Sequence, residues 1–189
     1  MRRAIGRPAW LHDAERVDAA VFAAVAATPT PALDRVMRQL TCAADHSRLS
    51  LAAAAVLALG RGPRGRRASG LGLASLGVTA AAVNLIVKPI ARRHRPDRDL
   101  HSVPLIRHVP MPLTRSFPSG HAASAFAFAT GVGHVLPRDA VPLRVLAAAV
   151  AYSRVHTGVH FPGDVLLGAL IGTAIAQVTA NALERRFAG

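Results

Sequence analysis

The sequence predicts an all-α integral membrane bundle of about six transmembrane helices, and three observations favour this fold class. Hydrophobic residues make up 51% of the 189 residues, and the mean hydropathy is positive, at +0.31. The formal net charge is nevertheless +13, carried by short bursts of arginine between long uncharged stretches. This mixture is rare in soluble enzymes and typical of membrane helices joined by basic loops. No stretch alternates with a period of two, so strands are not expected.

The first third of the chain contains two short apolar segments, residues 17–28 and 49–60. The first stops at the Pro29/Pro31 pair, and the second has only 12 residues, fewer than the roughly 20 that cross a bilayer. Each of them either spans by extending into its polar flanks or lies in the interface. We expect residues 1–46 to form an N-terminal helical segment that is partly interfacial.

Two later segments are long enough to cross a membrane. Residues 68–87 are 20 uncharged residues followed by Lys88, and residues 165–183 are 19 uncharged residues followed by Glu184. Glycine and small hydroxyl residues in the first of these segments suit close helix packing in lipid. Both segments are predicted to be transmembrane helices.

The segments 122–136 and 145–153 are shorter, and both Pro137 and Pro142 stand between them. Because proline commonly ends or interrupts helices, the two prolines predict a turn. We therefore expect a helical hairpin here.

The chain is expected to be a single domain, residues 1–189, because no linker or repeat divides it; its motif-bearing core is 66–184. Arginines crowd residues 61–67 and recur at Arg185 and Arg186, on the same side in a six-helix count. The positive-inside rule then places these ends in the cytoplasm. The loop 89–117 and the active site are expected on the extracytoplasmic face of the plasma membrane.

The basic character does not predict nucleic-acid binding, because only 4% of the residues are aromatic and few are available to stack on bases. The single cysteine, Cys42, excludes an intramolecular disulfide and a cysteine-based zinc site, and we expect its thiol to be buried. The sequence predicts neither a metal site nor a cofactor, and it leaves the oligomeric state open.

Three polar clusters contain the groups that a phosphate-handling site needs. They are Lys88 with Arg95 and Pro96, then Pro118-Ser119-Gly120-His121, then Ser153-Arg154 with His160 and Asp164. Each cluster follows or opens a predicted helix at the same membrane face, so we expect them to converge. Lys88 is the only lysine among 23 basic residues, which makes its position in the first cluster notable.

The side chains in these clusters suit phosphoryl transfer, in which negative charge must be stabilised on three equatorial oxygens. Lys88, Arg95 and Arg154 supply cations for this purpose. Ser119 and Gly120 stand where a helix begins, so they offer a hydroxyl and an accessible amide to an anion.

Two histidines provide for the bond-breaking steps. One of them can attack phosphorus while the other protonates the departing oxygen. Asp164 follows His160 by four residues and can hold the other ring nitrogen of that histidine. A diphosphate substrate would need more cations, which Arg92, Arg98, Arg107 or Arg115 could supply.

The three clusters together resemble the signature of the type 2 phosphatidic acid phosphatase (PAP2) superfamily, which reads Lys-x6-Arg-Pro, Pro-Ser-Gly-His and Ser-Arg-x5-His-x3-Asp. The chain departs from this signature at no position between residues 88 and 164. The resemblance implies a PAP2/haloperoxidase-like helical core and metal-independent hydrolysis through a phosphohistidine. It further implies that His160 is the nucleophile, Asp164 its orienting partner and His121 the acid. The phosphate-binding shell implied by the resemblance is Lys88, Arg95, Ser119, Gly120 and Arg154.

By this resemblance the expected function is hydrolysis of a lipid phosphate or diphosphate, either phosphatidic-acid-like or polyprenyl (undecaprenyl) diphosphate. Two alternatives stay open at this point. One is a vanadium-dependent haloperoxidase, because vanadate resembles the phosphoryl transition state and uses a similar shell. The other is a non-catalytic basic membrane protein that binds anionic lipid.

Overall fold

The computed structural model describes residues 8–91 and 93–187, and within these ranges it contains helices and loops but no strand. The helices are α1 (Ala9–Ala27), α2 (Pro31–Ala43), α3 (Arg48–Gly60), α4 (Gly62–Ala82), α5 (Lys88–Ile90), α6 (Gly120–Gly133), α7 (Pro137–His156) and α8 (Pro162–Phe187). Short 3₁₀ turns cover Asp45–Ser47 and Leu105–Arg107, and a π-helical turn, Val83–Val87, joins α4 to α5. The all-α prediction is confirmed.

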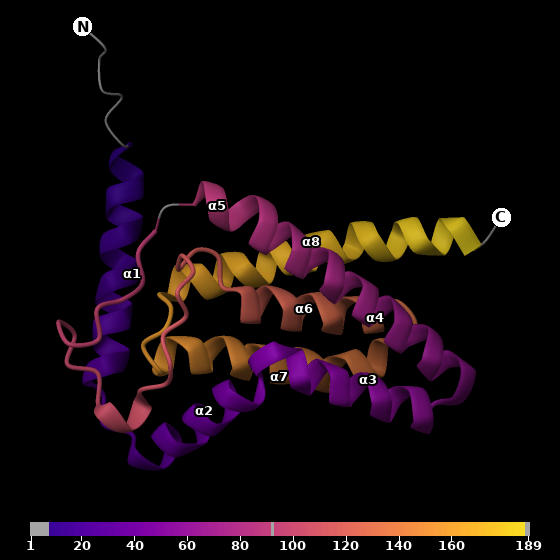
Figure 1. Cartoon of the computed structure of the whole chain (residues 1–189), viewed down its shortest axis with the longest axis horizontal. Helices are drawn as coiled ribbons and strands as arrows, with labels where there is room; N and C mark the ends of the chain where they lie inside the picture. The colour runs from indigo at the N-terminus through magenta and orange to yellow at the C-terminus, as the bar shows by residue number, and fades with distance from the viewer. Residues whose placement is uncertain (1–7, 92, 188–189) are drawn as a thin grey trace, which may run out of the picture.

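Helices α3, α4, α6, α7 and α8 run along a common bundle, and α6 contacts α4, α7 and α8 (Figure 1). Helix α6 can occupy this central position because its sequence is almost entirely small and apolar, and Ala123, Ala127 and Phe128 are buried. Helix α3 packs on α4, and α4 also contacts α8. This packing brings the start of α6 to one end of the bundle.

Two glycines of α8 allow it to lie directly against the first turn of α6. A Cβ atom added at Gly168 would lie 2.6 Å from the carbonyl oxygen of Ser119, and one at Gly172 would lie 2.1 Å from that of Ala123. Only glycine therefore permits this backbone approach.

Within residues 8–91 and 93–187, two helices are long and apolar enough to cross a membrane: the continuous rod Gly62–Ile90 and Pro162–Arg186. They contain the two segments, 68–87 and 165–183, that the sequence marks as the clearest spans. Helices α2 and α3 meet at a bend of 64° and together make a third candidate span. When that pair is counted as one span, six long helices are present in the described part of the chain.

The expected hairpin is present as α6 and α7, but Pro142 lies inside α7 and not in the turn. The turn precedes Pro137, which occupies the first helical turn, where a missing N–H is tolerated. Pro142 follows only five residues later, so the backbone hydrogen bond it removes is near the helix start.

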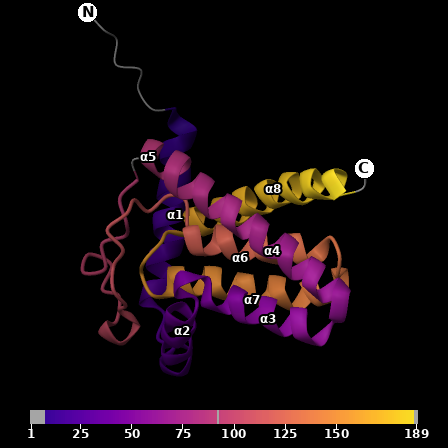
Figure 2. The same cartoon turned by 45° about the vertical axis from the view of Figure 1, so that its right-hand side comes forward.

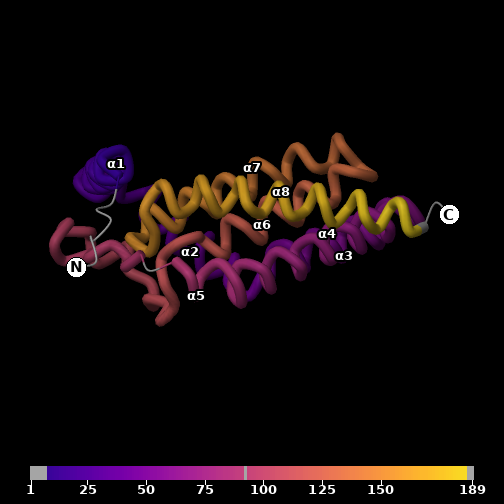
Figure 3. Tube along the Cα trace, turned by 90° about the horizontal axis from the view of Figure 1, so that it is seen from above, coloured from indigo at the N-terminus to yellow at the C-terminus, as the bar shows by residue number. Residues whose placement is uncertain are grey.

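Helix α1 lies across the end of the bundle and not along it, as Figures 1 and 2 show, and in Figure 3 it is seen nearly end-on. Its Phe22 and Ala26 are buried against Val103, Val155 and Val165. This orientation is compatible with the partly interfacial segment expected for residues 1–46, of which residues 1–7 lie outside the described residues.

The expectation that Cys42 is buried is wrong, because its side chain is exposed. The neighbouring Thr41 and Met37 occupy the inward face of α2, which packs on α7, so the residue after Thr41 points away from that contact.

The bundle has two chemically different ends. One end carries the α3–α4 turn and the end of α8, where Arg67 Nη2 lies 3.5 Å from Glu184 Oε1. The arginine-rich 61–67 and Arg185–Arg186 therefore do share one end, as the sequence predicts. The opposite end carries α1, the loop after α5, the start of α6 and the α7–α8 connection.

Candidate active site

The three polar clusters meet at that opposite end, as the sequence predicts. Lys88 Nζ lies 3.4 Å from Thr114 Oγ1, and Arg95 Nε donates to the Thr114 carbonyl oxygen at 2.9 Å. A Cβ atom on Gly120 would lie 3.5 Å from Lys88 Nζ, so the lysine stands over the start of α6. The first two clusters thus line one side of a common site.

The N-terminus of α6 is tied to the third cluster by its backbone. Ser119 is the N-cap residue, and its hydroxyl accepts a long hydrogen bond of 3.5 Å from the amide of Ala122. The Ser119 amide donates to the carbonyl oxygen of Asp164 at 2.9 Å. The amides of Gly120 and His121, at the start of α6, have no acceptor among the described residues, and a helix start of this kind favours an anion.

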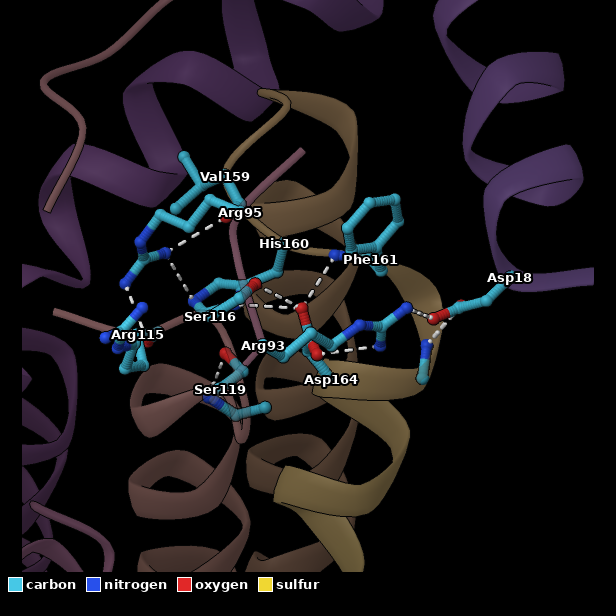
Figure 4. A network of polar contacts seen from close by, with 12 residues as sticks. Asp18, Arg93, Arg95, Arg115, Ser116, Ser119, Val159, His160, Phe161 and Asp164 are labelled. Atoms are coloured by element: carbon cyan, nitrogen blue, oxygen red, sulfur yellow. Dashed lines mark hydrogen bonds and ion pairs between the residues drawn. The ribbon is translucent and has the colours of Figure 1, made fainter. Parts of the chain in front are cut away.

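His160 lies buried between a cation and a carboxylate (Figure 4). Its Nε2 is 3.2 Å from Arg95 Nη1, and its Nδ1 is 3.5 Å from Asp164 Oδ2. Burial lowers the pKa of His160 to about 4; Asp164 opposes this shift, and Arg95 adds to it. The imidazole is therefore neutral at pH 7, and with Nδ1 facing the carboxylate the Nε2 lone pair is directed to the cationic side.

Asp164 is held by more groups than His160 alone. It accepts hydrogen bonds from the Ser116 hydroxyl, from Arg93 Nη1 at 2.9 Å and from the Phe161 amide at 3.0 Å (Figure 4). Arg93 also pairs with Asp18 of α1 and lies over the Phe161 ring. Sequence reasoning missed both Arg93 and Ser116. Arg93 is one of several arginines in a short run, and Ser116 lies just before the Pro-Ser-Gly-His motif.

Arg154 is almost fully buried at the end of α7. Its Nη1 donates to the Thr41 hydroxyl, while its Nε–H has no hydrogen-bond partner among the described residues. A buried guanidinium N–H without a partner is costly unless an anion reaches it. Arg95 is likewise partly buried, which lowers the pKa of its guanidinium, with Asp164 opposing the shift.

His121 stands in the first turn of α6, and its Nε2 lies 2.9 Å from Asp45 Oδ1. Asp45 belongs to the 3₁₀ turn between α2 and α3. The sequence contains no signal for this contact, since 76 residues separate the two partners and Asp45 lies outside the three clusters.

The arginines suggested for a second phosphate do not all remain available. Arg107 is fully buried, pairs with Asp34 at 2.7 Å and donates to the carbonyl oxygen of Thr28, so its guanidinium is committed to holding the loop on α1 and α2. Arg98 donates to two backbone carbonyl oxygens, and its buried Nη2 has no hydrogen-bond partner among the described residues. Arg115 is exposed, and Arg92 lies outside the described residues.

A cavity of about 250 Å³ opens beside this site between α3, α4, α6 and α7. Lys88, Gly120 and His121 line its polar end. The rest of its lining includes small hydroxyl and amide side chains as well as apolar ones: Ser47, Ser50, Asn84, Ser124, Phe128, Leu143 and Leu146. The cavity therefore suits a molecule with a polar head and an apolar remainder.

A family model described as the PAP2 superfamily matches residues 68–188, which include all three clusters. The chain belongs to the PAP2 superfamily. The family resemblance seen in the signature residues is thereby confirmed.

Several proteins that are similar in sequence to this PAP2 protein carry the names of lipid phosphatases. It is 33% identical over 170 residues to decaprenylphosphoryl-5-phosphoribose phosphatase of Mycobacterium tuberculosis (strain ATCC 25618 / H37Rv), covering 87% of this chain and 90% of that protein. It is 31% identical over 105 residues to lipid A 1-phosphatase of Rhizobium johnstonii, covering 54% of this chain and 42% of that protein.

Among solved structures, LpxE of Aquifex aeolicus superposes with a TM-score of 0.70 at 25% identity, covering 87% of this chain and 95% of that one. A transmembrane PAP2 type phosphatidylglycerolphosphate phosphatase from Bacillus subtilis gives 0.68 at 25% identity, covering 92% and 87%. These likenesses confirm the predicted membrane-bundle fold and the predicted enzyme class, a phosphatase.

Proposed function

We propose that this PAP2 protein hydrolyses a phosphomonoester or diphosphate of a membrane lipid through a phosphohistidine at His160. The observation that carries this mechanism is the neutral, buried His160, whose Nε2 faces Arg95 while its Nδ1 faces Asp164. Such a ring has a free lone pair and a carboxylate ready to stabilise the cationic phosphohistidine.

We assign each step of the proposed reaction to a residue of the site. His160 Nε2 attacks phosphorus, the bond from phosphorus to the lipid oxygen breaks, and His121 gives that oxygen a proton. His121 then takes a proton from water as the water oxygen attacks phosphorus. The N–P bond breaks, which releases inorganic phosphate and restores both histidines.

The phosphoryl oxygens would be held by a cationic cradle. Lys88, Arg95 and the unpaired Nε–H of Arg154 neutralise their charge, and the Ser119–Gly120 start of α6 adds a hydroxyl and backbone amides. The family's metal independence is expected to hold, since these groups supply the positive charge that metal ions supply in many other phosphoryl-transfer enzymes.

Two observations support a polyprenyl-linked phosphate as the first substrate to test. The cavity beside Lys88 and His121 has both polar and apolar lining, and a relative that is matched over 87% of the chain is named for a decaprenylphosphoryl-5-phosphoribose. Phosphatidic-acid-like lipids and undecaprenyl diphosphate share the same reacting group. The phosphatase names of the relatives favour hydrolysis over the haloperoxidase alternative.

We propose in addition that the catalytic end faces the extracytoplasmic side of the plasma membrane. The opposite end carries a dense group of exposed arginines, which the positive-inside rule retains in the cytoplasm. They are Arg61, Arg64, Arg66, Arg67, Arg185 and Arg186.

The mechanism is tested by phosphate release in detergent and EDTA from decaprenylphosphoryl-5-phosphoribose, undecaprenyl diphosphate, phosphatidate and phosphatidylglycerol phosphate. His160→Ala should lower turnover of every accepted lipid by roughly 10⁴-fold or more, because it removes the nucleophile. A matched control is His134→Ala, which changes a histidine that bonds Gln177 at the opposite end of the bundle. Retained turnover in His160→Ala, or loss of wild-type turnover in EDTA, would contradict the mechanism.

A further inference from the structure

Asp45 is the carboxylate closest to the proposed general acid. Its Oδ1 lies 2.9 Å from His121 Nε2, yet it stands outside the signature residues 88–164 and outside the family match 68–188. We propose that Asp45 is the positioning residue of His121, so that the site contains two histidine–carboxylate pairs. This inference rests on the proposed function, because it assigns a role within that same reaction.

A bend between two helices places this carboxylate. Helices α2 and α3 bend by 64° at the turn that contains Asp45. The two residues that follow, His46 and Ser47, have φ values of 54° and 58°, in the left-handed region that non-glycine residues rarely adopt. Consecutive unfavourable backbone conformations persist only where the surrounding structure enforces them, and here they set Asp45 against the first turn of α6.

The cationic cradle explains why a general acid here needs a carboxylate. Lys88, Arg95 and Arg154 favour a bound phosphate, but burial of His121 and the positive charges of Arg154 and Lys88 disfavour its protonated imidazole. Asp45 supplies a negative charge in direct contact with the ring, which offsets that repulsion while the proton is carried.

The contact also decides which nitrogen meets the substrate. With Nε2 bonded to Asp45, the remaining ring nitrogen, Nδ1, is the one left to exchange a proton with the departing oxygen. The arrangement parallels that of His160, whose Nδ1 faces Asp164 and whose Nε2 faces the cradle.

A competing role for Asp45 follows from its second contact. Its Oδ1 is 3.9 Å from Arg154 Nη1. In this second role Asp45 is a phosphate stand-in: its carboxylate occupies the place of a phosphate oxygen beside Arg154, and the substrate must displace it. The two roles predict opposite effects. Removing a positioning residue slows release of the alcohol, whereas removing a stand-in speeds the reaction or tightens substrate binding.

The test compares p-nitrophenyl phosphate with decyl phosphate. The two esters share a phosphoryl group, but their leaving groups differ in whether they need a proton from a general acid. p-Nitrophenolate departs without a proton, whereas the alcohol of decyl phosphate requires one. Release of nitrophenol and of decanol is measured in single turnovers with purified full-length enzyme in excess, which isolates the first step. Asp45→Asn should slow decanol release about 100-fold and nitrophenol release less than about threefold. The ratio of the two rates within one variant does not depend on the fraction of enzyme that is folded.

Two further variants sharpen the result. Asp139→Asn, which changes an aspartate paired with Arg61 at the opposite end, should leave both rates unchanged. In a His121→Ala background, Asp45→Asn should add no further loss, because the group that it positions is gone.

Other outcomes overturn the proposal in distinguishable ways. Equal losses with both esters would make Asp45 a purely structural residue, and faster turnover or a lower KM would make it a phosphate stand-in. If wild-type enzyme hydrolyses neither these esters nor any lipid phosphate, the proposed function fails and this inference fails with it.

Discussion

At the scale of single residues, Lys88 combines an unusual identity with a confined position. It is the only lysine in the chain, and its ammonium lies between Thr114 and the start of α6. An ammonium is a compact point charge, whereas a guanidinium is planar, larger and fixed in its donor geometry. Charge alone therefore does not define what this position requires.

Lys88→Arg should keep the charge and still lower kcat/KM by about tenfold or more, because a planar guanidinium with fixed donors cannot reproduce the point charge of the ammonium beside Gly120. Phosphate release measures this change, with Arg66→Lys at the opposite end as the charge-preserving control. Full activity in Lys88→Arg would show that the site needs only a positive charge.

The signature residues could be predicted individually from the sequence, because their types and spacings are local. Their partners could not. Asp18, Arg93 and Ser116 hold Asp164 in a chain of contacts that joins α1 to the α7–α8 connection. Nothing in the local sequence distinguishes these residues from other aspartates, arginines and serines, since each is selected only by what the fold places beside it.

At the scale of helices, the contact between α6 and α8 positions the anion-binding helix start. Gly168 and Gly172 are four residues apart on one face of α8, and each faces a backbone carbonyl group of α6. A uniformly apolar sequence allows helices to associate, but these two positions set how near the backbones come.

Gly172→Ala should force the two backbones apart, because its Cβ atom would lie 2.1 Å from the Ala123 carbonyl oxygen. Overpacking of this kind costs about 1–3 kcal/mol, which corresponds to a fall in Tm of about 2–12 °C for a chain of this size. Thermal unfolding in detergent measures the effect, and phosphatase activity should fall with it as Ser119 moves.

Gly70→Ala is the matched control, because a Cβ atom there meets nothing within 4 Å. Alanine is the better helix former by up to about 1 kcal/mol, so the Tm should stay unchanged or rise. Equal destabilisation by both substitutions would mean that close α6–α8 packing is not the reason for Gly172.

At the scale of the whole molecule, the arginines at the two ends of the bundle differ in how exposed they are. Both ends are basic, but the arginines at the α3–α4 end are exposed, whereas most of the arginines around the candidate active site are partly or wholly buried: Arg93, Arg95, Arg98, Arg107 and Arg154. Counting basic residues along the sequence cannot make this distinction, which is why the overall charge bias is a weak guide to orientation.

The proposed orientation predicts which end an impermeant reagent reaches. In a Cys42→Ser background, Leu100→Cys should react with an impermeant maleimide on intact cells, because Leu100 is exposed in the loop of the catalytic end. Arg138→Cys, after the α6–α7 turn, should react only after permeabilisation. The reverse pattern would place the catalytic end in the cytoplasm.

The sequence by itself determined the membrane class, the two clear spans and the three clusters, because hydropathy and motif spacing are properties of neighbouring residues. Only the tertiary structure decided that Arg107 is a buried partner of Asp34, that α1 crosses the bundle end, and that Asp45 reaches His121. These outcomes depend on how distant segments pack. The sequence shows that a residue is charged, but it does not show which opposite charge or which phosphate will lie beside that residue in the folded protein.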